Sequence, residues 1–474
     1  MTKNSKKYLL SLIILATFIS CATNPEAQKT ETTSSSVQFW LTNPDKSSLF
    51  QQQSATQTSV IGGSVPTLEV FDSQVFQSID GFGCALTGGS AILLNQMDAA
   101  AKDKLLKELF ATDGSNIGIS YLRVSIGASD LSDRVFTYDD LPYGQTDTAM
   151  IQFSLDQEQK DLIPILKQIL VINPDIKILG SPWTAPVWMK TQNSSIGGSL
   201  KTQYYSAYAK YFVKYVQEMK ANGIRIDAIT IQNEPLYGGN NPSMLMSAAE
   251  QTTFIKNYLG PIFKTDNIDT KIIIYDHNAD RTDYPITVMN DPEAKKYING
   301  SAFHLYGGTI DDLSKVQAAH PDKAIYFTEM WVGAPGNFLT DIDWHVKNLI
   351  IGGMRNWCRN VIEWNLASDP AQNPHTPGGC TQCLGAITID GNSITRNPAY
   401  YILAHSAKFV RPGSARIAST VSTVLPNVAF RTQDGKKVMI VLNDSGGTQI
   451  FKLIAGSETL TYSLKAGAVG TFVW

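Results

Sequence analysis

The sequence predicts an α/β protein: a closed (β/α)8 barrel, or TIM barrel, with a β-sandwich appended to it. Eight short β-rich segments alternate with longer helical patterns along the middle of the chain, and the two flanks carry only short alternating runs. Strands that alternate with helices build parallel sheets, and eight such units favour a closed barrel over an open sheet. No G-x-G-x-x-G opens a helix after the first strand, which argues against a dinucleotide-binding enzyme.

The barrel is expected to span residues 80–410. The eight predicted strands are 80–86, 121–127, 176–181, 227–233, 271–276, 301–305, 324–329 and 360–366. The helical patterns between them include 97–110, 202–221 and 248–259. Gly223 follows the second of these helices, where a helix C-terminus favours a residue that tolerates positive φ.

Both flanks predict β structure. Residues 414–474 contain alternating runs at 437–442, 449–454 and 469–474, separated by the turn sequences Asp-Ser-Gly-Gly and Lys-Ala-Gly. Similar short runs lie near the other end of the chain. We therefore expect residues 37–79 and 411–474 to share one β-sandwich packed on the barrel.

The extreme N-terminus predicts an export signal over residues 1–20. Three lysines precede an apolar run that is too short to span a membrane, and Cys21 follows it. The end of the run resembles the lipobox of bacterial lipoproteins, with Phe18 where Leu is usual; an ordinary cleaved signal is the alternative. We expect lipidation at Cys21, a flexible tether over 21–36, and a lipid anchor as the only membrane contact. The prediction is an exported bacterial lipoprotein at the outer membrane or cell surface, or facing the periplasm.

The composition of the chain argues against several other classes of protein. The 474 residues carry 39 basic and 42 acidic side chains, a net charge of −3, without a long basic run, so a nucleic-acid partner is not expected. Hydrophobic residues make up 43% of the chain, enough for a large core. Five cysteines are too few for a disulfide scaffold. Cys380 and Cys383 form a C-x-x-C that suits a zinc half-site, a redox pair or a short disulfide; because no second pair completes a zinc site, a local disulfide outside the cytoplasm is favoured.

Polar and aromatic residues gather at the predicted strand ends, where the active sites of such barrels lie. They are Asp130, Trp183, Asn233, Glu234, His304, Tyr306, Glu329 and Trp364. Two carboxylates on one barrel mouth suit cleavage of a glycosidic bond, and tryptophans can stack on sugar rings. A lone strand-end Glu is more often a surface residue, and a lone Trp or His is more often structural. Their joint appearance carries the prediction.

Seven segments together resemble glycoside hydrolase family 30, which includes lysosomal glucosylceramidase and microbial endo-β-1,6-glucanases. They are DGFGCALT at 80–87, RVSIGASD at 123–130, SPWTAPVW at 181–188, QNEP at 232–235, FHLY at 303–306, TEMW at 328–331 and EWNLA at 363–367. The resemblance runs from about Asp80 to the C-terminus. It implies a retaining hydrolase without metal or other cofactor, built as a (β/α)8 barrel with a side β-sandwich.

The resemblance also implies a role for each residue. Glu234 would be the general acid/base and Glu329 the nucleophile, with Arg123 supporting the nucleophile and Asn233 bonded to the sugar 2-hydroxyl. Asp130, Trp183 and Trp364 would line the glucose subsite. Chemistry then demands a protonated Glu234, in an apolar site or close to negative charge. It also demands an ionised Glu329 beside donors such as Arg123, Tyr306 and His304.

The preferred substrate is β-1,6-glucan. The segment 375–385, which contains the C-x-x-C, is similar to loops of bacterial family members that act on this linkage, and no Arg-bearing uronate clamp of the xylan-specific branch is found. A β-glucosidase or glucosylceramidase, or a β-xylosidase, is the alternative within the family. A surface glycan-binding lipoprotein without activity is the alternative from another class; it would not need both carboxylates. We expect a monomer.

Overall fold

The computed structural model describes residues 37–54 and 65–474. The predicted signal, Cys21 and the predicted tether lie outside these residues. Within the described ranges, no helix is long and apolar enough to cross a membrane.

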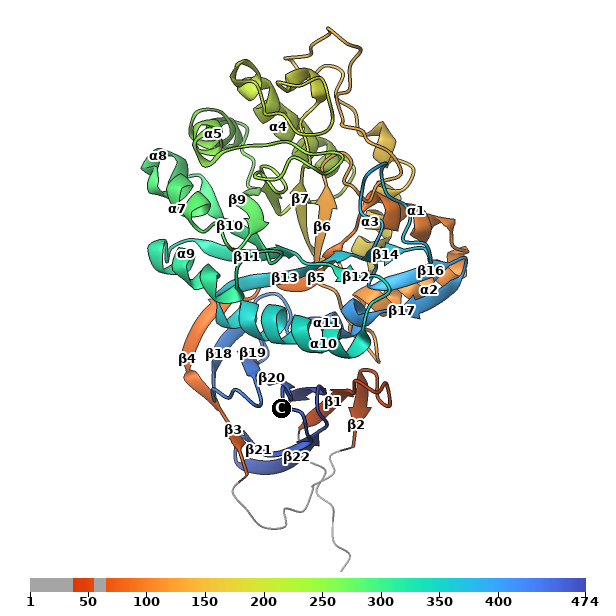
Figure 1. The fold of residues 1–474 in the computed structure, drawn as a ribbon, viewed down its shortest axis with the longest axis vertical. Helices are drawn as coiled ribbons and strands as arrows, with labels where there is room; N and C mark the ends of the chain where they lie inside the picture. The colour runs from red at the N-terminus through yellow and green to blue at the C-terminus, as the bar shows by residue number, and fades with distance from the viewer. Residues whose placement is uncertain (1–36, 55–64) are drawn as a thin grey trace, which may run out of the picture. The chain divides into compact units, whose positions relative to one another are not determined.

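Eight parallel strands close into a barrel, which confirms the predicted fold class (Figure 1). In chain order these strands are β5 (Gly81–Ala85), β6 (Tyr121–Ser125), β7 (Lys177–Ser181), β8 (Ala228–Thr230), β9 (Lys271–Asn278), β10 (Ile298–His304), β11 (Ala324–Glu329) and β13 (Cys358–Asn365). Each strand pairs with its sequence neighbours, and β13 pairs with β5 to complete the ring. Buried side chains fill the barrel interior, among them Tyr121, Leu179, Ala228, Ile273, Ala302, Tyr326 and Ile362.

The fourth strand is shorter than predicted. The sequence pattern predicts 227–233, but β8 ends at Thr230. Residues 231–233 lie between the end of β8 and Glu234, which has a φ of 47°. The chain therefore leaves the sheet before it reaches the predicted acid.

Helices follow most of the barrel strands. They are α1 (Gly88–Gln96), α2 (Ala99–Phe110), α3 (Leu162–Ile172), α4 (Tyr205–Ala221), α5 (Ala248–Phe254), α6 (Gly260–Thr265), α7 (Asp283–Asn290), α8 (Pro292–Lys295), α9 (Leu313–Ala319), α10 (Phe338–His345) and α11 (Pro398–Ala407). Two π-helical turns, Ile255–Leu259 and Val346–Gly353, continue α5 and α10. Ser247 begins α5 with a capping box, in which its hydroxyl accepts from the Glu250 amide and the Glu250 carboxylate accepts from the Ser247 amide.

Strands from both ends of the chain share the β-sandwich. One sheet has the order β2-β1-β23-β20-β19-β18-β4, and the other has the order β22-β21-β3. Their bounds are β1 (Gln38–Thr42), β2 (Gln51–Gln53), β3 (Thr67–Leu68), β4 (Val70–Ser78), β18 (Ala415–Ser419), β19 (Asn427–Arg431), β20 (Lys437–Leu442), β21 (Gln449–Ala455), β22 (Glu458–Leu464) and β23 (Val469–Val473). Figure 1 shows β1 beside the blue C-terminal strands.

One buried histidine joins the barrel to both chain ends. His405 on α11 bonds through Nδ1 to Thr471 Oγ1 (2.9 Å) and through Nε2 to Thr42 Oγ1 (2.7 Å). Burial lowers the pKa of His405 to about 3, so the ring is neutral. A neutral ring can accept from one hydroxyl while it donates to the other, and this contact ties α11 to β1 and β23.

Short strands shape the last two loops above the barrel. They are β12 (Val332–Gly333), β14 (Ala367–Ser368), β15 (Cys383–Leu384), β16 (Ile387–Asp390) and β17 (Ser393–Arg396). The β12–β15 pair joins the loop after β11 to the segment that contains the C-x-x-C. Both loops therefore border the same mouth of the barrel.

Candidate active site

Glu329 is the last residue of β11 and lies in a cage of donors. Its Oε2 accepts from Arg123 Nη1 at 2.5 Å, and its Oε1 accepts from the Tyr306 hydroxyl at 3.0 Å. The Glu329 side chain is only 8% exposed. Of the three donors expected from the sequence, Arg123 and Tyr306 contact this carboxylate.

Arg123 lies at the centre of the site, with no exposed surface, on β6. Its Nη2 donates to Asn233 Oδ1 (2.7 Å), Asp276 Oδ2 (2.8 Å) and Ser181 Oγ (3.2 Å). A planar guanidinium can hold several acceptors in fixed directions, which a lysine cannot do. Because the Oδ1 of Asn233 is occupied in this way, its Nδ2 remains the group that could donate to a sugar hydroxyl.

His304 bridges two other carboxylates. Its Nδ1 lies 3.2 Å from Glu234 Oε1 and its Nε2 lies 3.1 Å from Asp276 Oδ1, whereas Glu329 Oε1 is 3.9 Å away. His304 therefore bonds Glu234 and Asp276 and lies at ion-pair distance from Glu329. The ladder between β9 and β10 shifts register between Ala302 and Phe303, which leaves Asp276 of β9 without a partner in the ladder.

The two predicted catalytic carboxylates lie close together. One carboxylate oxygen from each of Glu234 and Glu329, together with a ring nitrogen of His304, lie within 4.8 Å of one another. Retaining glycosidases hold their two carboxyl groups about 5–5.5 Å apart, whereas inverting enzymes need about 6.5–9.5 Å to admit a water molecule. Three ligand atoms at this spacing could also hold a metal ion, but the adjacent Arg123 guanidinium repels a cation and already neutralises Glu329.

Burial and charge shift the pKa values of this cluster. Although burial opposes it, the charge of Glu329 and the bonds to Asp276 and Glu234 raise the pKa of His304 to about 9. Burial acts to raise the pKa of Glu234, but the bond to the His304 imidazolium outweighs it and lowers that pKa. Burial raises the pKa of Glu329 against the attraction of His304 and Arg123, and the Glu234 charge adds to the rise.

The predicted roles require a protonated Glu234 and an ionised Glu329, so the lowered pKa of Glu234 and the raised pKa of Glu329 are opposite to those expected. The cause is His304: its charged ring favours the anion of Glu234, and two buried carboxylates this close do not both ionise freely. The charge states of Glu234 and Glu329 in the substrate-free site therefore depend on His304.

Asp276 is a site residue that the sequence analysis missed. It is fully buried and accepts from Arg123, from His304 and from three hydroxyls, which belong to Ser181, Thr230 and Thr328. These donors lower its pKa far below the usual range despite its burial. It is the last residue of the predicted fifth strand, so its position in the sequence carried a signal that could have found it.

Trp183 and Trp364 form the floor of the site. Their rings stack at 5.4 Å, and the Arg123 guanidinium lies 4.8 Å from the Trp183 ring. The two residues are only 2% and 4% exposed, so a sugar could contact a small part of each ring. The buried Trp183 Nε1–H has no hydrogen-bond partner among the described residues.

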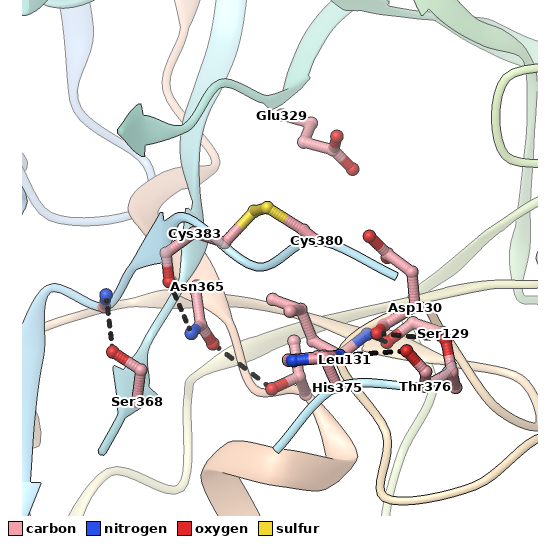
Figure 2. The surroundings of a disulfide bond; sticks show 12 residues. Ser129, Asp130, Leu131, Glu329, Asn365, Ser368, His375, Thr376, Cys380 and Cys383 are labelled. Atoms are coloured by element: carbon pink, nitrogen blue, oxygen red, sulfur yellow. Dashed lines mark hydrogen bonds between the residues drawn. A yellow bond between two sulfur atoms is a disulfide. The ribbon is translucent and has the colours of Figure 1, made fainter. Parts of the chain in front are cut away.

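A disulfide joins Cys380 to Cys383 beside the site. Figure 2 shows it beside Glu329 and Asp130. The Asp130 carbonyl accepts from the Thr376 amide at 2.9 Å and from the Thr376 hydroxyl at 3.3 Å. Burial and the charges of Glu329 and Glu234 raise the pKa of Asp130 to about 7. The disulfide-bonded segment therefore holds Asp130 in place.

A parallel barrel whose mouth holds a close carboxylate pair, a buried arginine and tryptophans defines a glycoside hydrolase of the retaining class. Comparisons with known proteins agree. Residues 79–410 match the glycosyl hydrolase family 30 TIM-barrel domain, and residues 413–472 match the family 30 beta-sandwich domain. The chain belongs to glycoside hydrolase family 30, as the motif resemblance predicted.

The relatives of the chain include proteins named endo-1,6-beta-glucanase and proteins named glucosylceramidase. The chain is 36% identical over 397 residues to an endo-1,6-beta-D-glucanase of Aspergillus fumigatus, which covers 78% of this chain and 79% of that protein. It is 31% identical over 399 residues to the lysosomal acid glucosylceramidase of Mus musculus, over 78% and 76% of the two chains. The solved structure of the endo-beta1,6-glucanase BT3312 superposes with a TM-score of 0.85 at 34% identity, over 92% of this chain and 99% of that one.

Proposed function

We propose that this glycoside hydrolase cleaves β-1,6-glucan, with Glu329 as the nucleophile and Glu234 as the general acid/base. The carboxylate spacing within 4.8 Å is the observation that carries the double-displacement assignment. The endo-1,6-beta-glucanase names of the fungal relatives and of a solved structure support the substrate. The near-neutral charge of the chain suits an uncharged polysaccharide.

In the first step, Glu329 attacks the anomeric carbon while the glycosidic C–O bond breaks. The leaving oxygen takes the proton from Glu234, and the sugar becomes esterified to Glu329. The positive charge that develops at the anomeric carbon favours the Glu329 anion, so it selects the arrangement with the proton on Glu234. His304, 3.2 Å from Glu234 Oε1, is placed to supply that proton.

In the second step, water attacks the anomeric carbon and loses its proton to Glu234. The ester bond breaks, and Glu329 leaves as a carboxylate held by Arg123 and Tyr306. Both attacks invert the anomeric carbon, so the product keeps the β configuration. Asn233 is positioned to bond the 2-hydroxyl, and Asp130 and the two tryptophans to hold the glucose.

Two glutamine variants test the roles. Glu329→Gln should abolish turnover of both pustulan, a β-1,6-glucan, and an aryl β-glucoside. Glu234→Gln should slow pustulan far more than an aryl glucoside, whose leaving group needs no proton. Glu158→Gln is the matched control, since Glu158 is also buried but bonds Tyr138 away from the reacting groups. Wild-type rates for Glu329→Gln would refute the assignment.

Product sizing tests the substrate. Short β-1,6-linked oligosaccharides from pustulan, with laminarin and xylan intact, would support the proposal. Glucose released only from the aryl substrate would favour the glucosidase or glucosylceramidase alternative, which the mouse relative supports. Binding without activity on any substrate would favour the glycan-binding module.

We also propose export of the chain and acylation at Cys21, on the basis of the N-terminal sequence pattern. Radioactive palmitate in a bacterial host should label the parent chain and not the Cys21→Ala variant. Equal label in both would refute lipidation and leave the enzymatic proposal untouched.

A further inference from the structure

A second concave region adjoins the catalytic mouth. It is a groove of about 690 Å³ between the loop after β6 and the loop after β7. Its lining includes Tyr143, Gln145, Trp188, Lys190, Asn193 and Tyr204. These two loops follow Ser125 and Ser181, the last residues of β6 and β7, and loops at the carboxyl ends of barrel strands share one face. The groove therefore lies on the same face as the catalytic pair.

Two aromatic rings on one side of the groove are fixed in place. Trp188 and Tyr204 pack edge to face, with ring centroids 5.0 Å apart and planes at 77°. The Trp188 Nε1–H donates to the Asp139 carbonyl at 3.0 Å. Rigid, partly exposed rings offer apolar area at little entropic cost, which suits contact with the C–H faces of sugars.

Tyr143 lies on the groove lining and is held in an outward position by its turn. The Gln145 amide donates to the Pro142 carbonyl at 3.0 Å, and Gly144 has a φ of +82°. This is the geometry of a type II turn, which needs glycine at its third position. No atom within 4 Å would meet a Cβ at Gly144, so the glycine serves the backbone conformation and not the space around it. The turn leaves Tyr143 88% exposed.

Charge along the groove is sparse and balanced. The Asp140 carboxylate is occupied by the Thr137 amide and hydroxyl. Lys190 donates to two backbone carbonyls, and burial lowers its pKa to about 7. Lys201 lies over the Tyr204 ring at 5.8 Å. A groove with rings, amides and little net charge fits a neutral, hydroxyl-rich ligand and not a polyanion.

We propose that this groove is a second glucan-binding site, which holds a distal stretch of the same β-1,6-glucan chain that enters the catalytic pocket. Trp188 follows Trp183 by five positions in the chain, so their Cα atoms are at most about 18 Å apart. One oligosaccharide chain can span that distance. The inference rests on the proposed function and adds that affinity for polymer exceeds affinity for a single glucosyl unit.

Tyr143→Ala is the test variant, because the exposed Tyr143 side chain makes no hydrogen bond to any other described residue. The KM for pustulan should rise about three- to tenfold, the value of one aromatic contact. Tyr143→Phe should stay near the parent value. Ile151→Ala is the matched control, since Ile151 is 83% exposed on the same loop and lies outside the groove lining. On an aryl β-glucoside, the variants should have the same kcat/KM as the parent.

Binding gives a second readout that needs no turnover. In the Glu329→Gln background, the Kd for pustulan should rise about three- to tenfold on adding Tyr143→Ala and stay constant on adding Ile151→Ala. If the parent chain cleaves pustulan but Tyr143→Ala leaves both KM and Kd unchanged, the groove is not a glucan site and the proposed function stands. An equal loss of kcat/KM on the aryl glucoside would also refute glucan binding in the groove. If the parent does not cleave pustulan, the proposed function fails, while a Tyr143-dependent Kd would still support the groove.

Discussion

Replacing Arg123 by methionine tests the centre of the network. The substitution keeps an unbranched, flexible side chain but removes the cation between Glu329, 2.5 Å away, and Asp276, 2.8 Å away. Arg123 and Asp276 have no exposed side-chain surface. Breaking a buried ion pair by removing one partner costs about 3–5 kcal/mol, against a typical total stability of about 5–15 kcal/mol. Because Asp276 keeps its bonds to His304 and to three hydroxyls, we expect the free energy of unfolding to fall by about 3 kcal/mol.

The same substitution should change the pH dependence of catalysis. Arg123 opposes the burial that raises the pKa of Glu329, so its removal should raise that pKa further. The nucleophile must be ionised, and the acid limb of the kcat/KM profile should therefore move to higher pH. Loss of one preorganised donor to a reacting group typically lowers kcat about 10²–10³-fold, and a loss of that size is expected here.

Denaturant unfolding and pH–rate profiles measure both effects. Arg134→Met is the matched control, because Arg134 pairs with Asp133 at 3.0 Å on the surface, and such pairs contribute at most about 1 kcal/mol. The reasoning is refuted if Arg123→Met unfolds at the same denaturant concentration as Arg134→Met and its acid limb does not move.

Three further outcomes follow from the structure. Replacing Cys380 and Cys383 by serine should raise KM more than it lowers kcat, because Asp130 loses the support of the disulfide-bonded segment; an unchanged KM would contradict this role. Burial raises the pKa of Asp139 to about 7, so the folded state binds its proton more tightly than the unfolded chain and stability is lost as pH rises from about 4 to about 7. The Tm of Asp139→Asn relative to the parent should therefore increase between about pH 5 and pH 8, and a constant difference would count against it. Tyr306→Phe removes one of the two hydrogen bonds to the nucleophile and should lower kcat/KM on pustulan and the aryl glucoside alike, which product assays would show.

The barrel could be predicted because its signals are local. The barrel strands are short and largely apolar, and seven of the eight end in a polar residue, while β5 ends at Ala85. The closure of all eight matches the predicted order. Glu329 is the clearest case, since the strand ends at this residue both in the pattern and in the structure. Apolar periodicity reports burial, and burial is what defines a barrel strand.

Partner choice within the site could not be predicted in the same way. His304 bonds Glu234 and Asp276 and lies farther from Glu329, and these distances depend on contacts between strands that leave no periodic signal in one sequence. Asp276 was overlooked because a strand-end aspartate is usually solvated, and only the structure shows five donor groups converging on it. The pKa directions of the two glutamates depend on these same contacts.

Backbone strain explains why the site needs such a network. Glu234, Tyr275 and Asp276 all have positive φ, at 47°, 73° and 68°, although none is glycine. A left-handed residue of this kind costs roughly 1–2 kcal/mol. Tyr275 and Asp276 lie within β9, and Glu234 lies after the end of β8. The Glu234 amide donates to the Asp276 carbonyl at 2.9 Å, so the strained positions support each other. The donors around Asp276 thus offset the strain, and the convergence of charge that catalysis requires is held in place before any substrate binds.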